Sequence, residues 1–325
     1  MRAVVFTGAG GNEVVRVEER PDPVPQGDEV LLAVRFSGLN PADLAQRAGH
    51  YPAPPGSPAD IPGIETAGTV VAFGPTARRF GVGERVFGIV GGGGHADRVV
   101  VHERHVVPVP DRLDDLMAAA VPEAYVTAHD AVMTQAGLRM GELLVVNGAN
   151  GAVGTAAVQI GAAAGARVLA TIRATELRER VAALGADVIA PEELVAAAIE
   201  RGGADVVLEL VGAPNLERDL DALAVKGRVI VVGTGGGDTA PVALRRLMAK
   251  RARLMGTALR ARLLEEKAAA VQAFAREVVP HLATGRIDPL VDHVFPADEA
   301  AAAFERLAAP GKLGKVLLDF GESGA

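Results

Sequence analysis

A strand, a glycine-rich turn, a helix and a second strand follow one another between residues 143 and 172, and this stretch constrains the fold most. The run LLVVN (143–147) is continuously apolar, as expected of a parallel strand that is covered on both faces. Gly148, Gly151 and Gly154 then open an Ala-rich helix that leads to the strand RVLATI (167–172). A β-α-β rhythm of this kind predicts an α/β fold with a doubly wound parallel sheet.

The spacing of these glycines, G-x-x-G-x-x-G, points to a phosphate ligand. Glycines let the backbone N–H groups at a helix N-terminus approach a pyrophosphate without obstruction by Cβ atoms. The strict fingerprint has glycine where this chain has Ala149, and a tight turn in any α/β protein is the alternative interpretation. The flanking strands favour a dinucleotide site. The residues predicted to bind the dinucleotide at this turn are Asn147, Gly148, Asn150, Gly151, Ala152, Val153 and Gly154.

The end of the second strand bears on which nicotinamide cofactor is bound. An NAD site places Asp or Glu there for the ribose 2′-hydroxyl, whereas this chain reads Thr171, Ile172, Arg173 and has no acid before Glu176. An arginine can pair with a 2′-phosphate that a carboxylate would repel. The pattern therefore favours NADPH over NADH, with Arg173 and Thr175 near the adenosine phosphate. The alternative is that Arg173 is a solvated loop residue.

The rest of the chain predicts a second domain. Val-rich runs separated by Gly and Pro clusters precede Leu113 and predict short strands in a small barrel or sandwich. Helices and strands then alternate until about Thr257, where the rhythm fades. The simplest account is a cofactor domain, 119–257, inserted between the two parts of a β domain, 1–118 and 258–325. The helices predicted outside the glycine turn are 122–137, 175–185, 215–223, 265–283 (disturbed at Pro280) and 298–307.

Composition excludes several classes of protein. There is no Cys among 325 residues, so there can be no disulfide framework, Cys-ligated zinc or thiol nucleophile. The formal net charge of −7 gives no global attraction to nucleic acid or acidic lipid. We expect a cytoplasmic protein without membrane or nucleic-acid partners, and we interpret the basic run 245–253 as a solvated helix face. A GGGG run at 91–94 has no assigned purpose.

A series of segments in a fixed order is more specific than any glycine motif. The segments are GLNPADLAQRAGHYPAPPG (38–56), IPGIETAGTV (61–70), PEAYVTAHDAV (122–132), NGANGAVGTAAVQI (147–160) and LMGTALRARLLEEKAA (254–269). Through them the chain, from Met1 to Phe320, resembles the zinc-independent quinone oxidoreductase family of the medium-chain dehydrogenase/reductase superfamily. It is most similar to the branch that includes the tumour-suppressor-inducible quinone oxidoreductase.

The resemblance implies a GroES-like β domain, a Rossmann domain and a substrate cleft between them. It also implies NADPH-dependent reduction of quinones or related electron-poor carbonyl compounds by a homodimer. It assigns Asn40, Asp43 and Tyr51 to the cleft beside the nicotinamide, Thr127 to a cofactor contact, and Val232 and Gly233 to the nicotinamide pocket. Family members often carry a lysine and a tyrosine near the 2′-phosphate. Leu177 stands at the lysine position here and no tyrosine follows, so Arg173 or Arg178 would substitute.

Zinc alcohol dehydrogenases share this architecture, so a metal has to be considered. Their catalytic zinc needs a Cys near Ser37 and a His where this chain has Ile64, so the ligand set fails. His102 and His105 have the spacing of metal ligands but no third partner. We therefore expect no metal site.

Hydride transfer without a metal requires an aligned cofactor, a dry pocket and a hydrogen-bond donor for the developing quinol oxyanion. The Tyr51 hydroxyl and the Asn40 amide are the candidate donors. Asp43 would hold one of them or relay a proton, or it simply caps the helix that NPAD opens; Tyr51 in turn could simply anchor its loop. Two other activities stay open: reduction of an enone or enoyl thioester on the same fold, and a catalytically silent protein that binds NADPH.

Overall fold

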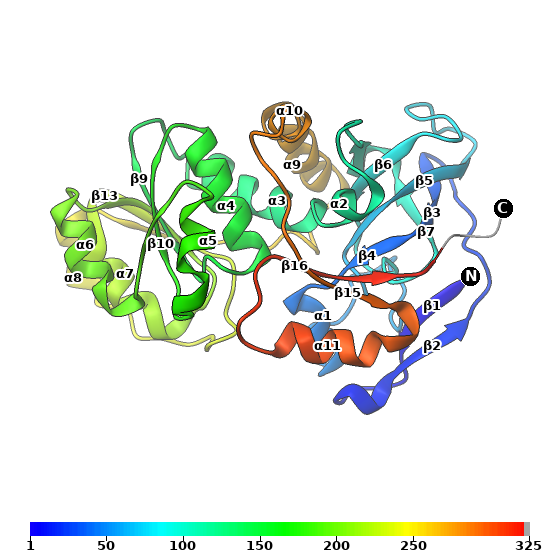
Figure 1. Ribbon diagram of the computed structural model, residues 1–325, viewed down its shortest axis with the longest axis horizontal. Coiled ribbons are helices and arrows are strands. Elements are labelled where there is room, and N and C mark those ends of the chain that lie inside the picture. Colours follow the sequence, from blue (N-terminus) through cyan, green and yellow to red (C-terminus); the bar gives the residue numbers. More distant parts are fainter. Residues whose placement is uncertain (322–325) are drawn as a thin grey trace. The chain divides into compact units, whose positions relative to one another are not determined.

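The computed structural model describes residues 1–321, which form two compact units (Figure 1). Unit 1 consists of Met1–Val126 and the chain from Leu259 onward, and unit 2 is Thr127–Ala258. The predicted domain limits, 118/119 and 257/258, stay predictions. Within the described residues, no helix has both the length and the apolar character needed to cross a membrane.

Unit 2 is built on a six-stranded parallel sheet with the order β11-β10-β9-β12-β13-β14. The predicted doubly wound sheet is thereby confirmed. The strand order reverses between β9 and β12, and ligands of such sheets bind outside the carboxyl ends of the strands at this reversal. The strands are β9 (Leu143–Asn147), β10 (Arg167–Thr171), β11 (Asp187–Ile189), β12 (Ala204–Glu209), β13 (Leu223–Val231) and β14 (Arg253–Gly256).

Helices cover both faces of this sheet, which explains why β9 is apolar along its length. Leu143 packs with Leu194 of α6 and Leu220 of α7 in one buried cluster. The next side chain, Leu144, faces α4 so closely that a Cβ atom at Gly161 would lie 2.7 Å from it. The helices of unit 2 are α4 (Ala152–Ala163), α5 (Arg178–Ala182), α6 (Leu194–Glu200), α7 (Leu216–Ala222) and α8 (Leu244–Lys250).

Unit 1 contains a five-stranded antiparallel sheet, β7-β3-β5-β6-β8, a three-stranded sheet, β15-β16-β4, and the hairpin β1–β2. Val30, Leu32 and Val34 of β3 alternate into a Val-rich core, as expected of an antiparallel strand with one inward face. The strands are β1 (Arg2–Phe6), β2 (Val15–Glu19), β3 (Glu29–Val34), β4 (Phe36–Gly38), β5 (Glu65–Phe73), β6 (Arg85–Ile89), β7 (Arg98–His102), β8 (Val106–Pro108), β15 (Val291–Pro296) and β16 (Lys315–Asp319).

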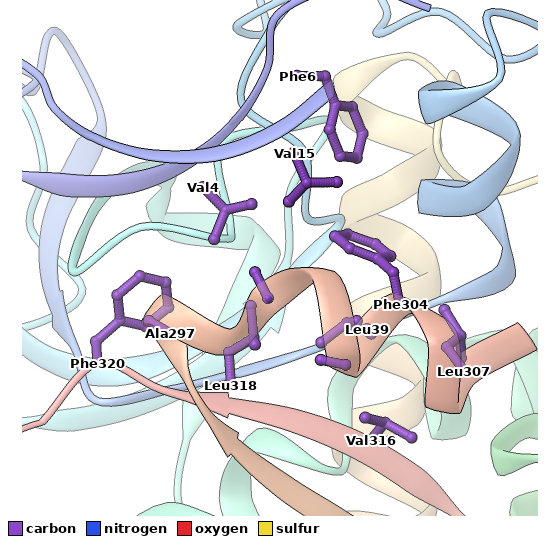
Figure 2. Close-up of a cluster of buried hydrophobic side chains, with 12 residues drawn as sticks. Val4, Phe6, Val15, Leu39, Ala297, Phe304, Leu307, Val316, Leu318 and Phe320 are labelled. Carbon is purple, nitrogen blue, oxygen red and sulfur yellow. The ribbon is translucent and has the colours of Figure 1, made fainter. Parts of the chain in front are cut away.

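A second core of unit 1 joins the hairpin β1–β2 to α11 and β16. Figure 2 shows Phe304 of α11 between Phe6 and Val15 of the hairpin and Leu39, with Val316 of β16 in the same cluster. The rings of Phe6 and Phe304 have centroids 5.6 Å apart. Burial of these side chains holds β16 in place. The first residue of β16 is Lys315, which is part of the site described below. The remaining helices are α1 (Pro41–Arg47), α2 (Asp115–Ala119), α3 (Pro122–His129), α9 (Leu264–Glu277), α10 (Val279–Thr284) and α11 (Ala300–Ala308).

Two helices predicted from the sequence are interrupted. The helix predicted at 122–137 is an α-helix to His129 and continues as a π-helical turn, Asp130–Gln135. The helix predicted at 265–283 ends at Glu277, and α10 begins with Pro280 in its first turn. Proline lacks an N–H group and its ring clashes with the preceding turn, so it starts a helix more readily than it continues one. The predicted disturbance at Pro280 is therefore confirmed.

Candidate active site

The glycine turn of unit 2 has the geometry of an anion cradle. Gly148 has a φ of +73°, a left-handed conformation that favours glycine. A Cβ atom at Gly154 would lie 2.6 Å from the Gly148 carbonyl oxygen, so the turn packs directly on α4. Gly151 is the N-cap of α4 and has no side chain to occupy the first N–H groups of that helix. These N–H groups can therefore bind a phosphate, and the residues present fit a pyrophosphate.

Two buried carboxyl groups lie at the reversal of strand order, where β9 and β12 end. Asn147 Nδ2 donates to Glu209 Oε2 and to Asp219 Oδ1, each at 2.7 Å. Thr171 Oγ1 donates to Asn147 Oδ1 at 2.8 Å. The Asn147 side chain, predicted to bind the cofactor, is thus engaged by this buried network. The signal that could have revealed Glu209 is an acid at the end of the apolar run VVLEL in the strand ADVVLELVG.

Glu209 also holds the loop that follows β12. Its Oε1 accepts hydrogen bonds from the backbone N–H groups of Val211 and Gly212, at 2.5 and 2.6 Å. The side chain of Val211 lies against the glycine turn, where a Cβ atom on Gly148 would be 3.3 Å from Val211 Cγ2. The Glu209 carboxylate therefore holds in place the residue that packs against the glycine turn.

Val232 and Gly233, predicted to line the nicotinamide pocket, follow β13 and contact the carboxyl end of β12. The N–H groups of Val232 and Gly233 donate to the Glu209 carbonyl oxygen at 2.9 and 3.2 Å. A Cβ atom at Gly233 would lie 2.4 Å from the Leu210 carbonyl oxygen, so glycine is required for this approach. Thr127, the predicted cofactor contact, is buried in α3.

The predicted 2′-phosphate residues lie just after β10. Arg173 and Thr175 are exposed, and Arg173 makes no hydrogen bond or ion pair that is recorded within residues 1–321. Arg178 Nε is buried and has no hydrogen-bond partner there. Leu177, at the family's lysine position, is only 6% exposed and faces the core. The donors available for a phosphate at this strand end are therefore guanidinium groups.

Asn40 and Asp43, two predicted catalytic residues, are buried at the start of α1 in unit 1. Asn40 Nδ2 donates to Glu65 Oε1 at 2.8 Å and to the Gly38 carbonyl oxygen at 3.2 Å. Its Oδ1 accepts from Lys315 Nζ at 2.6 Å. Both hydrogens of the amide are thus used within unit 1. Asn40 could donate to a substrate only by giving up one of these bonds.

Lys315 and Glu65 form a buried ion pair with 2.5 Å between Nζ and Oε1, and each side chain is 1% exposed. Glu65 Oε2 accepts a further hydrogen bond, from the Glu123 backbone N–H at 2.9 Å. A buried ion pair is tolerated when its remaining polar atoms are hydrogen-bonded, as they are here. Sequence reasoning missed this pair. The signal was a lysine at the start of the otherwise largely apolar strand KVLLDF.

Asp43 is the acceptor of a fully buried hydrogen-bond cluster. It accepts from the Asn40 and Gly63 N–H groups at 2.8 and 3.1 Å, and its Oδ2 lies 3.2 Å from His95 Nε2. His95 Nδ1 lies 2.6 Å from Ser37 Oγ. Burial alone would raise the pKa of Asp43, but His95 and the two backbone donors lower it below its usual value. The helix-capping role is present, and a catalytic role for Asp43 stays a prediction.

Tyr51, the third predicted catalytic residue, is half-buried on the loop after α1. The Arg260 guanidinium lies over its ring, 5.1 Å from the centroid. No hydrogen bond of the Tyr51 hydroxyl is recorded within the described chain, so this donor is available to a ligand. The second tyrosine, Tyr125, is 1% exposed and donates to the Asp288 carbonyl oxygen at 3.1 Å.

His102 and His105 have other partners in unit 1. His102 Nδ1 accepts from the Arg104 N–H at 3.1 Å, and His105 Nε2 lies 3.1 Å from the Leu264 carbonyl oxygen. Burial lowers the pKa of His105 to about 4. Over residues 1–321, no three His, Asp or Glu side chains are grouped so that they could hold a metal ion.

Comparison with known proteins places both units in described families. Residues 26–111 match the family described as "Alcohol dehydrogenase GroES-like domain", and residues 152–276 match "Zinc-binding dehydrogenase". The quinone oxidoreductases of Homo sapiens and Rattus norvegicus are each 33% identical, over 98% of this chain and 97% of theirs. A segment that makes up 8% of erythronolide synthase EryA2 from Saccharopolyspora erythraea is 35% identical and covers 96% of this chain.

Solved structures agree with this placement. A quinone oxidoreductase of Pseudomonas syringae has a TM-score of 0.87 at 26% identity, and a mycobacterial protein complexed with NADPH has 0.88 at 27%. Each likeness covers 98% of this chain and 99% of the other. A GroES-like fold together with a six-stranded Rossmann sheet defines a medium-chain dehydrogenase/reductase, an oxidoreductase with a nicotinamide cofactor. This chain belongs to the quinone oxidoreductase family of that superfamily. The branch within the family stays a prediction.

Replacing Asp219 with Asn tests the buried carboxyl pair. Burial, together with the charge of Glu209 and a hydrogen bond to it, raises the pKa of Asp219 from its ordinary 3.8 to about 9. The native state then keeps a proton that the unfolded state releases above about pH 4, so this group lowers stability as the pH rises from about 4 to about 9. Asp219→Asn cannot ionise and should flatten that decline. Urea unfolding midpoints at pH 5 and pH 8 measure the effect.

Asp221→Asn is the matched control, because Asp221 lies on the same helix with a side chain that is 39% exposed and pairs with Arg246. Its pH profile should follow that of the unmodified protein. Parallel profiles for Asp219→Asn and the unmodified protein would contradict a shared proton in the Glu209–Asp219 pair.

Proposed function

We propose that the protein is an NADPH:quinone oxidoreductase that transfers hydride to a quinone or a related electron-poor carbonyl compound without a metal. The observation that carries the proposal is Tyr51, whose hydroxyl is available as a donor while Arg260 fixes its ring and backbone. The names of the similar curated proteins support a quinone as acceptor. The substrate is a small molecule, and a cytoplasmic location stays a prediction.

The chemistry divides between the cofactor and the chain. A bound nicotinamide supplies the hydride. Tyr51 donates a hydrogen bond to the oxygen that becomes negative as the quinone is reduced, and one such donor is worth roughly 2.7–4 kcal/mol where water is excluded. Asn40 and Asp43 act from buried positions: Asn40 bonds Lys315 and Glu65, and Asp43 bonds His95. They keep α1 and the loop that carries Tyr51 in place.

The cofactor is NADPH in this proposal. The N–H groups of the glycine turn would hold the pyrophosphate, and guanidinium groups after β10 would bind the 2′-phosphate. The exposed Arg173, the unpartnered Arg178 Nε and the lack of a carboxylate at that strand end support this, as does the NADPH complex of a similar structure. Val232 and Gly233 would line the nicotinamide pocket, and Thr127 would contact the cofactor.

Oxidation of NADPH, followed by its absorbance, tests the activity. We expect turnover with 1,4-benzoquinone and 9,10-phenanthrenequinone and little with crotonyl-CoA. The reverse pattern would favour the enone and enoyl-thioester alternative. NADPH binding without turnover of any acceptor would identify a catalytically silent binding protein and reject the proposal.

Arg173→Ala tests the choice of cofactor. A charge-assisted hydrogen bond contributes about 1.5–3 kcal/mol, so the Kd for NADPH should rise about 10-fold or more, whereas the Kd for NADH should not change. Titration of cofactor fluorescence measures both constants. Arg180→Ala is the control, because Arg180 is an exposed arginine of the neighbouring α5 without a predicted role. Equal losses for NADPH and NADH would show that Arg173 does not bind the 2′-phosphate.

A homodimer through β14 is part of the proposal. In the sheet order β14 is an edge strand paired to β13, and an edge strand can pair with a second copy. Apolar side chains are exposed on it and on α8: Leu254 at 37%, Leu244 at 68% and Met248 at 74%.

Light scattering tests the dimer: it should give twice the monomer mass, and Leu254→Lys should give monomers. Val225→Lys, at an apolar residue that is 58% exposed on β13, should stay dimeric; a monomeric unmodified protein would reject the dimer.

A further inference from the structure

Arg260 connects separate segments of unit 1 from a buried position. It precedes α9 and is 6% exposed. Its Nε donates to the Gly91 carbonyl oxygen at 2.7 Å, one Nη to the Tyr51 carbonyl oxygen at 3.3 Å and the other to Gln46 Oε1 at 2.6 Å. These acceptors belong to the tetraglycine run, the loop after α1 and α1 itself. The guanidinium is planar and its donors point in fixed directions. Arg260 therefore fixes the positions of these three segments relative to one another.

Tyr51 is held by Arg260 in two ways. The guanidinium binds its carbonyl oxygen and also lies over its ring, with 5.1 Å from Cζ to the centroid. A cation over an aromatic face is attracted by the ring, and more strongly when it is shielded from water. Both the backbone and the ring plane of Tyr51 are therefore restrained, which sets the direction of its hydroxyl.

The tetraglycine run explains how the loop can lie so close to Arg260. A Cβ atom at Gly91 would be 2.2 Å from Ser57 Oγ, and one at Gly94 would be 2.3 Å from the Glu65 carbonyl oxygen. The Gly93 N–H donates to the Ile61 carbonyl oxygen at 2.9 Å. The run thus lies flat on the segment between Tyr51 and β5, where side chains would force the two backbones apart.

The cost of burying Arg260 indicates that it is kept for more than stability. Its three hydrogen-bond acceptors are neutral, and no ion pair of Arg260 is recorded in the part of the chain that the structure describes. Burial lowers the pKa of its guanidinium, while the charge of Asp43 opposes that shift. A buried guanidinium with neutral acceptors carries a desolvation cost that an apolar side chain of similar volume would not carry.

We infer that Arg260 is a positioning residue, which orients the Tyr51 hydroxyl by tying the Tyr51 loop and the tetraglycine run to α1. This inference rests on the proposed function for its catalytic consequence. The arrangement of the loop itself can be measured without turnover.

A double-mutant cycle tests the catalytic consequence. Tyr51→Phe and Arg260→Met should each lower kcat/KM for 1,4-benzoquinone, by about 10-fold or more, because small misplacements of a catalytic group are costly. If Arg260 acts through Tyr51, the double variant should be no slower than Tyr51→Phe. If the loss of kcat/KM in the double variant equals the product of the losses in the two single variants, the inference is overturned. Thermal unfolding of Arg260→Met sets the assay temperature well below the unfolding transition, so that a loss of kcat/KM is not a loss of folded protein.

Fluorescence provides the measurement that does not depend on activity. The chain has no Trp and two Tyr, so Tyr51 is the sole fluorophore in a Tyr125→Phe background. In that background we test Arg260→Lys, which keeps the charge but loses the planar set of guanidinium donors. This variant should make Tyr51 more accessible to acrylamide quenching. The control is Arg104→Lys, because Arg104 makes a similar two-point contact, with Glu265 at the start of α9, and should leave quenching unchanged. Unchanged quenching in Arg260→Lys would overturn the inference even if quinone reduction is confirmed, and increased quenching would support it even if no quinone is reduced.

Discussion

The buried ion pair between Lys315 and Glu65 is the interaction on which the arrangement of unit 1 depends. It joins β16, from the end of the chain, to β5, and Asn40 bonds both partners at the start of α1. A charge buried without such partners would cost several kcal/mol. The position of α1 is therefore set by a polar contact between segments that are 275 residues apart in the sequence. Every predicted catalytic residue of unit 1 lies on α1, at its N-cap or on the loop that follows it.

The two units bury a carboxylate in different ways. Asp43 has His95 and two backbone donors, which hold it as an anion. Glu209 also accepts backbone N–H groups, but its titratable neighbour is another acid, Asp219. Two carboxylates this close cannot both ionise, so the pair keeps a proton. In each unit a carboxylate accepts backbone N–H groups of a loop, but its ionisable partner is a histidine in unit 1 and a second acid in unit 2.

Local patterns predicted local structure. The strand 143–147 has the predicted limits, and the glycine turn, the Asp43 cap and the break at Pro280 all depend on neighbours within a few residues. The roles of His95 and Arg260 could not be predicted in this way. Their partners are distant in sequence, as with Arg260 and Gln46, which are 214 residues apart. A sequence shows that a histidine or arginine is present, but the fold decides which carbonyl or carboxylate it meets.

The residues at the zinc-ligand positions of related alcohol dehydrogenases explain why such distant contacts matter here. Ser37 bonds His95, and Ile64 belongs to the apolar interior. A catalytic metal fixes the position of a substrate oxygen through its own coordination geometry. In the proposed mechanism a tyrosine hydroxyl on a loop takes this part, and such a hydroxyl loses much of its effect when its position is not fixed. Arg260 bonds both the Tyr51 carbonyl oxygen and the Gly91 carbonyl oxygen, so under that proposal the glycines at 91–94 serve the same requirement as the tyrosine.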